Sequence, residues 1–280
     1  YIYAMNDRKV ILLTGASSGI GHEAAMELLA QDHIVYAAAR RVEKMEDLAA
    51  AGAHVLSLDV TDSSSISGAV NAVLSQQGRI DVLINNAGYG YLGALEGVSM
   101  EEARRQLDVN LFGLAEMTKQ VLPYMRERRS GRIINISSVA GKVGIAFVGW
   151  YNVSKFAVES YSDVLRKEVR QFGIDVVIIE PSGIKTDWGI IAADNLARSN
   201  AGTVYEQSAL RFSRIMKKAY TSNLLSGPET VAKDICRAVN AKHPKLRYHP
   251  GLGAGTMLFL NAITPARWWD AINGKMFKND

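Results

Sequence analysis

Cysteine is almost missing from this chain of 280 residues, which contains Cys236 alone. A single cysteine excludes an internal disulfide, and with it the class of small secreted scaffolds that disulfides hold together. It suits a reducing compartment, and we expect the protein in the cytoplasm. Cys236 lies in a helical pattern, where a small buried side chain is the simplest interpretation.

Long apolar runs and a surplus of one charge are also missing. The longest apolar stretch near the C-terminus, residues 252–265, is shorter than the ~20 residues needed to cross a bilayer. The N-terminus lacks a basic segment followed by a long apolar run, so we expect no signal peptide. Basic residues outnumber acidic ones only by 32 to 28, which gives little support for nucleic-acid binding. The five histidines show no ligand spacing, so we expect no metal in the chemistry.

Apolar runs and helical patterns alternate from residue 9 to Pro181. The apolar runs are rich in Ile and Val without polar alternation, as in strands buried on both faces. This alternation predicts an α/β fold, a single-domain doubly wound parallel sheet of the Rossmann type. We expect one domain over 5–250, with an irregular helical segment at 187–226, and a helical C-terminal extension over 251–280.

A glycine-rich turn, TGASSGIG at 14–21, joins the first predicted strand to the first helix. Glycine lets the backbone approach a ligand closely, and a helix N-terminus offers free N–H groups to a pyrophosphate. The spacing G-x-x-x-G-x-G differs from the common G-x-G-x-x-G fingerprint. We expect a dinucleotide site rather than a turn without a ligand. The residues expected there are Gly15, Ser17, Ser18, Gly19, Ile20 and Gly21.

The tip of the second predicted strand carries Arg40 and Arg41, with no carboxylate beside them. Sites for NAD usually place an acidic residue here, whereas sites for NADP use arginine. A guanidinium grips a 2′-phosphate with two hydrogen bonds. The pattern favours NADP(H) over NAD(H), the alternative being two solvated arginines at the start of a helix.

Further motifs follow the glycine turn in a fixed order. They are LDVT at 58–61, NNAG at 85–88, LDVNLFG at 107–113, IINISSVAG at 133–141 and YNVSK at 151–155. Together with the glycine turn they resemble the short-chain dehydrogenase/reductase family over about residues 8–240. The resemblance implies an enzyme acting on CH–OH groups with a nicotinamide cofactor.

Tyr151 and Lys155 stand four positions apart and so share one helix face. Either the tyrosine packs in the core while the lysine side chain extends past it to solvent, or the two residues form an acid–base pair. The resemblance implies the acid–base pair. A cation ~4 Å away at an effective dielectric of ~20 would lower the phenol pKa by about 3 units, toward neutrality. The resemblance adds that Lys155 holds the nicotinamide ribose.

The resemblance assigns two more catalytic positions. Ser138 matches the residue that hydrogen-bonds the substrate carbonyl, and its spacing to Tyr151 favours it over Ser137. Asn110 matches a residue that opens its helix locally and holds a water on a proton path to the lysine. The resemblance also implies cofactor contacts from Asp59, Val60, Asn86, Ala87, Gly88, Pro181, Gly183, Ile184 and Thr186. Ser182 stands where the family usually has glycine.

The C-terminal region suggests the substrate. The extension resembles that of 17β-hydroxysteroid and retinol dehydrogenase-like members, and we expect a sizeable apolar ketone or alcohol such as a steroid, retinoid or keto-lipid. Trp268 and Trp269 are expected to line a pocket, or else to pack in the core, at a dimer surface or against a membrane interface. The segment 187–226 is expected to form a lid.

Two other functions are compatible with such a fold. A non-catalytic NADP-binding regulator or scaffold of the same fold would generally lack the tyrosine or the lysine. An epimerase or dehydratase of the extended branch would usually show G-x-x-G-x-x-G. The resemblance further implies a homodimer or homotetramer formed through two long helices, predicted at 99–129 and 150–172.

Overall fold

The computed structural model describes the backbone of residues 8–277 and the side chains of residues 8–271. Within that part of the chain seven strands form one parallel sheet, in the order β3-β2-β1-β4-β5-β6-β7. The predicted doubly wound fold is therefore confirmed. The strands are β1 (Val10–Thr14), β2 (Ile34–Ala39), β3 (His54–Ser57), β4 (Val82–Asn85), β5 (Gly131–Ile136), β6 (Ile174–Ile179) and β7 (Arg247–Tyr248).

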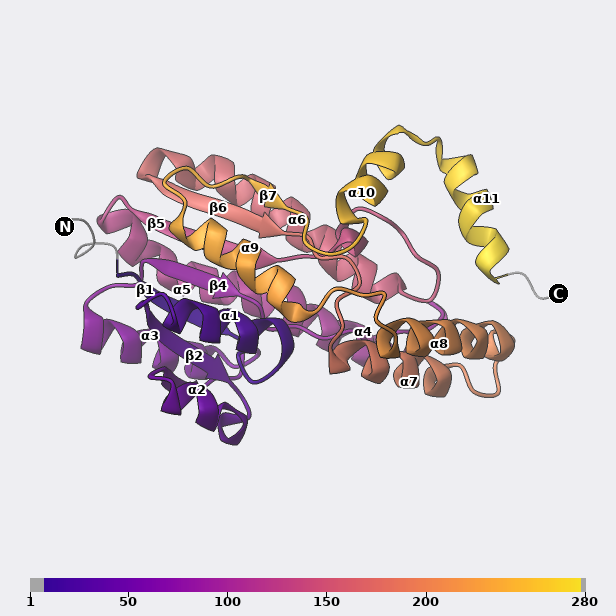
Figure 1. Cartoon of the computed structure of the whole chain (residues 1–280), viewed down its shortest axis with the longest axis horizontal. Coiled ribbons are helices and arrows are strands. Elements are labelled where there is room, and N and C mark those ends of the chain that lie inside the picture. The colour runs from indigo at the N-terminus through magenta and orange to yellow at the C-terminus, as the bar shows by residue number, and fades with distance from the viewer. Residues whose placement is uncertain (1–7, 278–280) are drawn as a thin grey trace.

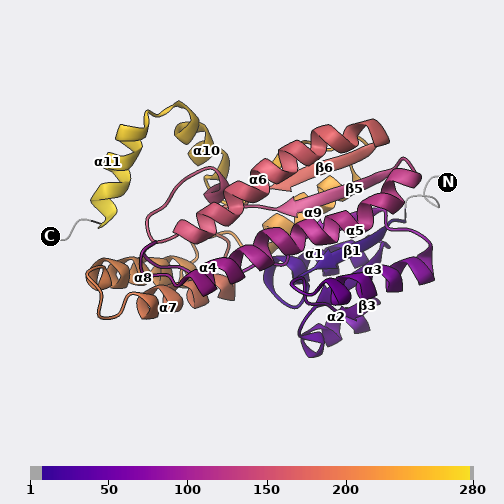
Figure 2. The ribbon, with the colours of Figure 1, turned by 180° about the vertical axis from the view of Figure 1, so that it is seen from behind.

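Helices cover both faces of the sheet (Figures 1 and 2). One apolar core lies between the sheet and helices α1, α2 and α9, and a second lies between the sheet and α3, α5 and α6. The helices are α1 (Gly19–Leu29), α2 (Glu46–Ala50), α3 (Ser63–Gln77), α4 (Met100–Leu107), α5 (Leu114–Glu127), α6 (Gly149–Val169), α7 (Asp187–Ser199), α8 (Glu206–Thr221), α9 (Pro228–Asn240), α10 (Ala254–Ile263) and α11 (Ala266–Phe277).

The sheet is apolar on both sides because each strand sends alternate residues into different cores. In β1, for example, Ile11 and Leu13 face the α1 side, while Val10 and Leu12 face the α5 side. All four side chains are fully buried. This arrangement explains why the strands read as continuous apolar runs, and it fixes the carboxyl ends of all the strands at one edge.

The long helix predicted at 99–129 is interrupted. Its central turn, Asp108–Gly113, is π-helical and separates α4 from α5. A π-turn inserts one extra residue into a helix and is often found at functional sites. Here it carries Asn110, whose side chain is buried.

The segment at 187–226 differs from the irregular form predicted for it. It contains two regular helices, α7 and α8, packed side by side beyond the carboxyl ends of the strands (Figure 1). Their shared apolar cluster includes Ala192, Leu196 and Ala209. The helices α10 and α11 then project from the same end of the molecule. No helix of residues 8–277 is long and apolar enough to cross a membrane.

Candidate active site

A cleft of about 1100 Å³ runs along the carboxyl ends of the strands and under α7 and α8. Every site residue expected from the sequence lines this cleft, except Gly21 and Asn110, which lie directly behind its wall. The lining residues among them are Gly15, Ser17, Ser18, Gly19, Ile20, Arg40, Arg41, Asp59, Val60, Asn86, Ala87, Gly88, Ser138, Tyr151, Lys155, Pro181, Gly183, Ile184 and Thr186.

Gly21 shapes the glycine turn from behind. A Cβ at this position would lie 2.4 Å from both the Gly15 carbonyl oxygen and the Asn86 side-chain nitrogen. Asn86 in turn donates from Nδ2 to the carbonyl oxygens of Thr14 and Gly15, at 3.0 and 3.1 Å. The turn is thus held tightly against the end of β4, and Gly15 adopts a φ of +72° that favours glycine.

The start of α1 fits an anionic group. Ser18 is the N-cap residue, but its side chain makes no capping hydrogen bond, and the first turn contains no acidic residue. The first N–H groups of the helix are therefore available as hydrogen-bond donors, and the positive end of the helix dipole faces the cleft. The residues present fit the pyrophosphate of a dinucleotide at this point.

The end of the cleft at the tip of β2 is basic. Arg40, Arg41 and Lys44 are exposed and line it, and Lys44 is a member that the sequence reasoning missed. Asp59 faces them. Burial by itself would raise the pKa of Asp59, but hydrogen bonds from Thr61 and the charge of Arg40 hold it below its usual range. The Asp59 carboxylate therefore lies within the influence of the Arg40 charge at this end of the cleft.

Tyr151, on the first turn of α6, meets Ser138 at the end of β5. Burial raises the pKa of the Tyr151 phenol, and a hydrogen bond with Ser138 acts in the opposite direction. The Ser138 hydroxyl also caps a short 3₁₀ turn by accepting from the Ala140 amide at 3.1 Å. The two hydroxyl groups therefore stand together at the same wall of the cleft.

Lys155 lies one turn further along α6 and is 7% exposed. Its ammonium donates to the Ile136 carbonyl oxygen at 2.7 Å and stands 5.7 Å from the centre of the Tyr151 ring. Burial lowers the pKa of Lys155 to about 8, while the charge of Glu159 acts in the opposite direction.

The sequence-based estimate for the Tyr151 pKa was wrong in direction for this arrangement. That estimate placed a cation beside the phenol oxygen, whereas the Lys155 ammonium points to a backbone carbonyl and faces the ring. Desolvation of the phenol is the larger effect, and it raises the pKa. Burial of this kind is set by packing, which the spacing of two residues does not reveal.

Asn110 supports the cleft wall from the π-turn. Its Oδ1 accepts from the Tyr89 amide at 3.0 Å, and its Nδ2 donates to the Tyr89 carbonyl at 2.9 Å and to the Ser154 hydroxyl at 3.1 Å. These bonds tie the segment after β4 to α6 next to Tyr151 and Lys155. The side chain of Asn110 is thus fully used in structural hydrogen bonds.

An apolar chamber adjoins the Tyr151 hydroxyl. Its nearest wall is Trp188 of α7, whose ring centroid lies 5.2 Å from that of Tyr151. Further lining side chains come from the segment after β4, the segment before α6, and α8. They are Leu92, Ile145, Val148, Phe212 and Met216. The sequence indicated a substrate segment at 187–226, but it could not single out these side chains.

The tryptophan pair of the extension does not line the cleft, so that part of the pocket prediction is wrong. Trp268 is 71% exposed, because α11 stands away from the sheet (Figure 1). The extension reaches the cleft instead through Met257 of α10.

Comparison with known proteins agrees with this geometry. A model of the short chain dehydrogenase family matches residues 9–195. The chain belongs to this family. It is therefore an oxidoreductase of the kind that interconverts a CH–OH group and a ketone.

Three relatives illustrate the family's range. A 3-ketodihydrosphingosine reductase of Bacteroides thetaiotaomicron is 42% identical over 87% of this chain and 88% of its own. Retinol dehydrogenase 8 of Bos taurus is 32% identical over 92% of this chain and 86% of its own. A variant of actinorhodin polyketide ketoreductase, solved with NADPH, is 30% identical, with a TM-score of 0.73 over 88% of this chain and 97% of its own.

Proposed function

We propose that the protein is an NADP(H)-dependent oxidoreductase that interconverts a sizeable apolar ketone and its secondary alcohol. The observation that carries this proposal is the position of the Tyr151 and Ser138 hydroxyls between the part of the cleft that begins at the glycine turn and the apolar chamber. A long-chain keto-lipid is the first substrate class to test, because the chamber is apolar and a relative at 42% identity is a ketodihydrosphingosine reductase. Steroids and retinoids are the other classes.

In the proposed reaction, bound NADPH supplies a hydride to the carbonyl carbon. The substrate oxygen lies between the hydroxyls of Ser138 and Tyr151, and Ser138 orients it with a hydrogen bond. Tyr151 gives its proton to that oxygen, which completes the alcohol. The Lys155 ammonium, 5.7 Å from the centre of the Tyr151 ring, stabilises the phenolate that remains. A proton then returns to Tyr151 along a path that passes the backbone of the segment around Asn110. In the opposite direction Tyr151 takes the proton.

The proposed preference for NADP(H) is supported by Arg40, Arg41 and the neighbouring Lys44, which line the cleft at the tip of β2 and could bind a 2′-phosphate. A fluorescence titration with NADPH and NADH tests it. The wild type should bind NADPH at least ~10-fold more tightly, since a charge-assisted hydrogen bond stabilises a complex by about 1.5–3 kcal/mol. Arg40→Ala/Arg41→Ala should lose that margin while keeping its NADH affinity. Equal affinities in the wild type would contradict the preference.

We also propose that domain 5–250 carries the cofactor and catalytic residues, while the extension from 251 covers the substrate end. Residues 250–266 contain no charged side chain. Within them α10 exposes Phe259, Leu260 and Ile263 beside Met257 at the cleft. This surface is suited to peripheral contact with a lipid interface. Co-sedimentation with phosphatidylglycerol vesicles tests this contact, and protein that stays in the supernatant speaks against it.

A second copy of the chain is proposed to cover the outer face of α5 and α6. That face exposes apolar side chains, which favour association. They are Phe112 of the π-turn that precedes α5, and Val153, Phe156 and Val164 of α6. Sedimentation velocity should then show a dimer or tetramer, and a monomer at micromolar concentration would count against this arrangement.

A further inference from the structure

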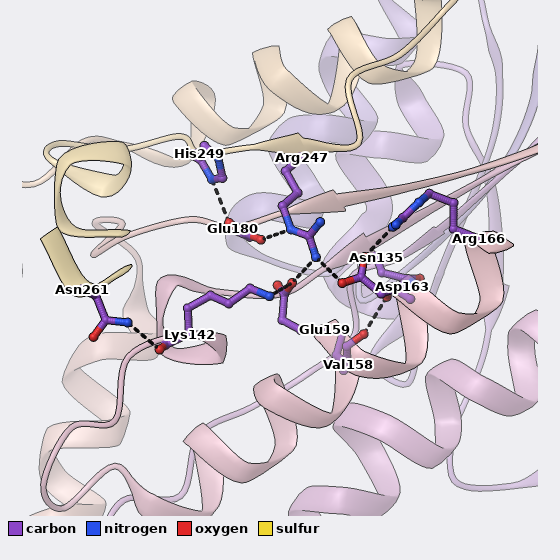
Figure 3. Close-up of polar contacts among 11 residues, drawn as sticks. Asn135, Lys142, Val158, Glu159, Asp163, Arg166, Glu180, Arg247, His249 and Asn261 are labelled. Atoms are coloured by element: carbon purple, nitrogen blue, oxygen red, sulfur yellow. Dashed lines mark hydrogen bonds and ion pairs between the residues drawn. The ribbon is translucent and has the colours of Figure 1, made fainter. Parts of the chain in front are cut away.

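A cluster of charged side chains joins α6 to the ends of β6 and β7 (Figure 3). Two of its carboxylates are almost completely buried: Glu159 of α6 is 2% exposed and Glu180, at the end of β6, is 1% exposed. Carboxylates at this depth require cations and hydrogen bonds to offset their lost hydration. Arg247 of β7 meets both, at 3.0 Å from Glu159 and 2.8 Å from Glu180.

Glu159 also pairs with a second cation, Lys142, on the side nearer the cleft. The Lys142 ammonium lies 3.2 Å from the same Glu159 oxygen that Arg247 contacts. Lys142 follows directly after the 3₁₀ turn that Ser138 caps. Its backbone carbonyl accepts from Asn261 of α10 at 3.0 Å, so the C-terminal extension is connected to the same group.

Three further ionisable residues, Asp163, Arg166 and His249, belong to the cluster. Arg247 also binds Asp163, one turn after Glu159 on α6, at 2.9 Å, and Asp163 pairs with Arg166. His249 contacts the second oxygen of Glu180 at 2.8 Å. Glu159 and Glu180 repel each other, which, after burial, helps to raise the pKa of Glu180 to about 7.

Glu159 is also the charged neighbour of Lys155. The two residues are four apart on α6 and therefore share a face. Gly141 packs between them: a Cβ there would lie 2.9 Å from Glu159 Cγ and 3.0 Å from the Lys155 carbonyl oxygen. The Lys155 ammonium itself donates to the neutral carbonyl of Ile136, which does not balance its charge.

We propose that Glu159 is a positioning residue for Lys155: its negative charge, fixed by Arg247 and Lys142, keeps the buried ammonium protonated where the proposed reaction needs it. The catalytic consequence rests on the proposed function, whereas the effect on the protonation of Lys155 does not. This electrostatic role is distinct from a merely structural one, in which Glu159 would only hold Arg247 between α6 and β7.

Direct titration of Lys155 separates the two roles. The protein is prepared with lysine labelled with ¹³C at Cε, and the Lys155 signal is assigned by its absence in Lys155→Met. The midpoint should lie near 8 in the wild type, because burial lowers the pKa of this ammonium. In Glu159→Gln it should fall by about one unit, since a neighbouring charge is lost at a low effective dielectric.

Two matched variants control for shape and for the network. Glu159→Asp keeps the charge and should retain a midpoint close to that of the wild type. Asp163→Asn removes a carboxylate that also binds Arg247, but one turn further from Lys155, and should leave the midpoint unchanged. A Glu159→Gln midpoint equal to that of the wild type, or an equal fall in Asp163→Asn, overturns the proposal.

Lys142→Gln provides a second route if Glu159→Gln does not fold. Lys142 is partly exposed, and its loss removes a positive charge while Arg247 still holds Glu159. The Lys155 midpoint should then rise, and an unchanged or lower midpoint counts against the proposal.

Ketone reduction is measured separately as a function of pH. The pH at which kcat/KM falls on the alkaline side should shift together with the NMR midpoint of Lys155. Shifted midpoints in an enzyme that reduces no ketone would refute the proposed function alone.

Discussion

The buried carboxyl of Glu180 should make the stability of the protein depend on pH in an unusual direction. Burial, the nearby charge of Glu159 and a hydrogen bond with it raise the pKa of Glu180 to about 7 from its ordinary value of 4.5. Between these two values the folded state keeps a proton that the unfolded chain has lost. The contribution of this group is therefore fully present below about pH 4.5 and is lost as the pH rises to 7.

The magnitude follows from the difference between the two pKa values. The two values differ by about 2.5, which at ~1.4 kcal/mol per pKa unit gives about 3 kcal/mol, and this difference already includes the opposing charge of Arg247. Glu180→Gln removes the titration and keeps the shape. Relative to the wild type, its free energy of unfolding should rise by up to about 3 kcal/mol between pH 5 and pH 8.

Urea denaturation followed by tryptophan fluorescence at several pH values measures this difference. Glu168→Gln is a suitable control, because Glu168 is exposed on the same side of the sheet, on α6. Its stability should stay parallel to that of the wild type across the range. Parallel curves for Glu180→Gln as well would refute the reasoning, since they would mean that Glu180 is ionised throughout.

Other predictions concern the site itself. Tyr151→Phe should lower kcat by at least ~100-fold, because it removes the proton donor, while the dissociation constant for NADPH changes little; equal losses in binding and turnover would point to a damaged cleft instead. Trp188→Ala should raise KM for a long-chain ketone more than for a short one, because it removes the aromatic wall 5.2 Å from Tyr151. Steady-state kinetics on the two ketones measures the change in each KM, and equal changes would mean that the alkyl chain of the substrate binds away from Trp188.

The fold and the outline of the site were predictable from the sequence, because both depend on local patterns. Continuous apolar strands predicted a parallel sheet, and the motifs around Gly15, Asn86 and Tyr151 sit at strand ends or helix starts. Since parallel strands share one edge for their carboxyl ends, residues far apart in sequence were expected in a single cleft. The structure places them there.

Features that depend on packing were not predictable. The Glu159 and Arg247 side chains meet although they are 88 positions apart, and no motif links them. The burial that raises the pKa of Tyr151 depends on α7 covering the cleft. The exposure of Trp268 depends on the direction in which α11 leaves the body, which apolar composition alone does not set.

The proposed reduction of a large apolar ketone by NADPH is tested most directly by kcat/KM for a series of linear ketones that differ only in chain length, measured with saturating NADPH. The value of kcat/KM should rise with chain length until the chamber is filled. The rise should be up to a factor of about four for each methylene buried, since each contributes about 0.8 kcal/mol. A flat series, or turnover confined to small polar ketones, would contradict it.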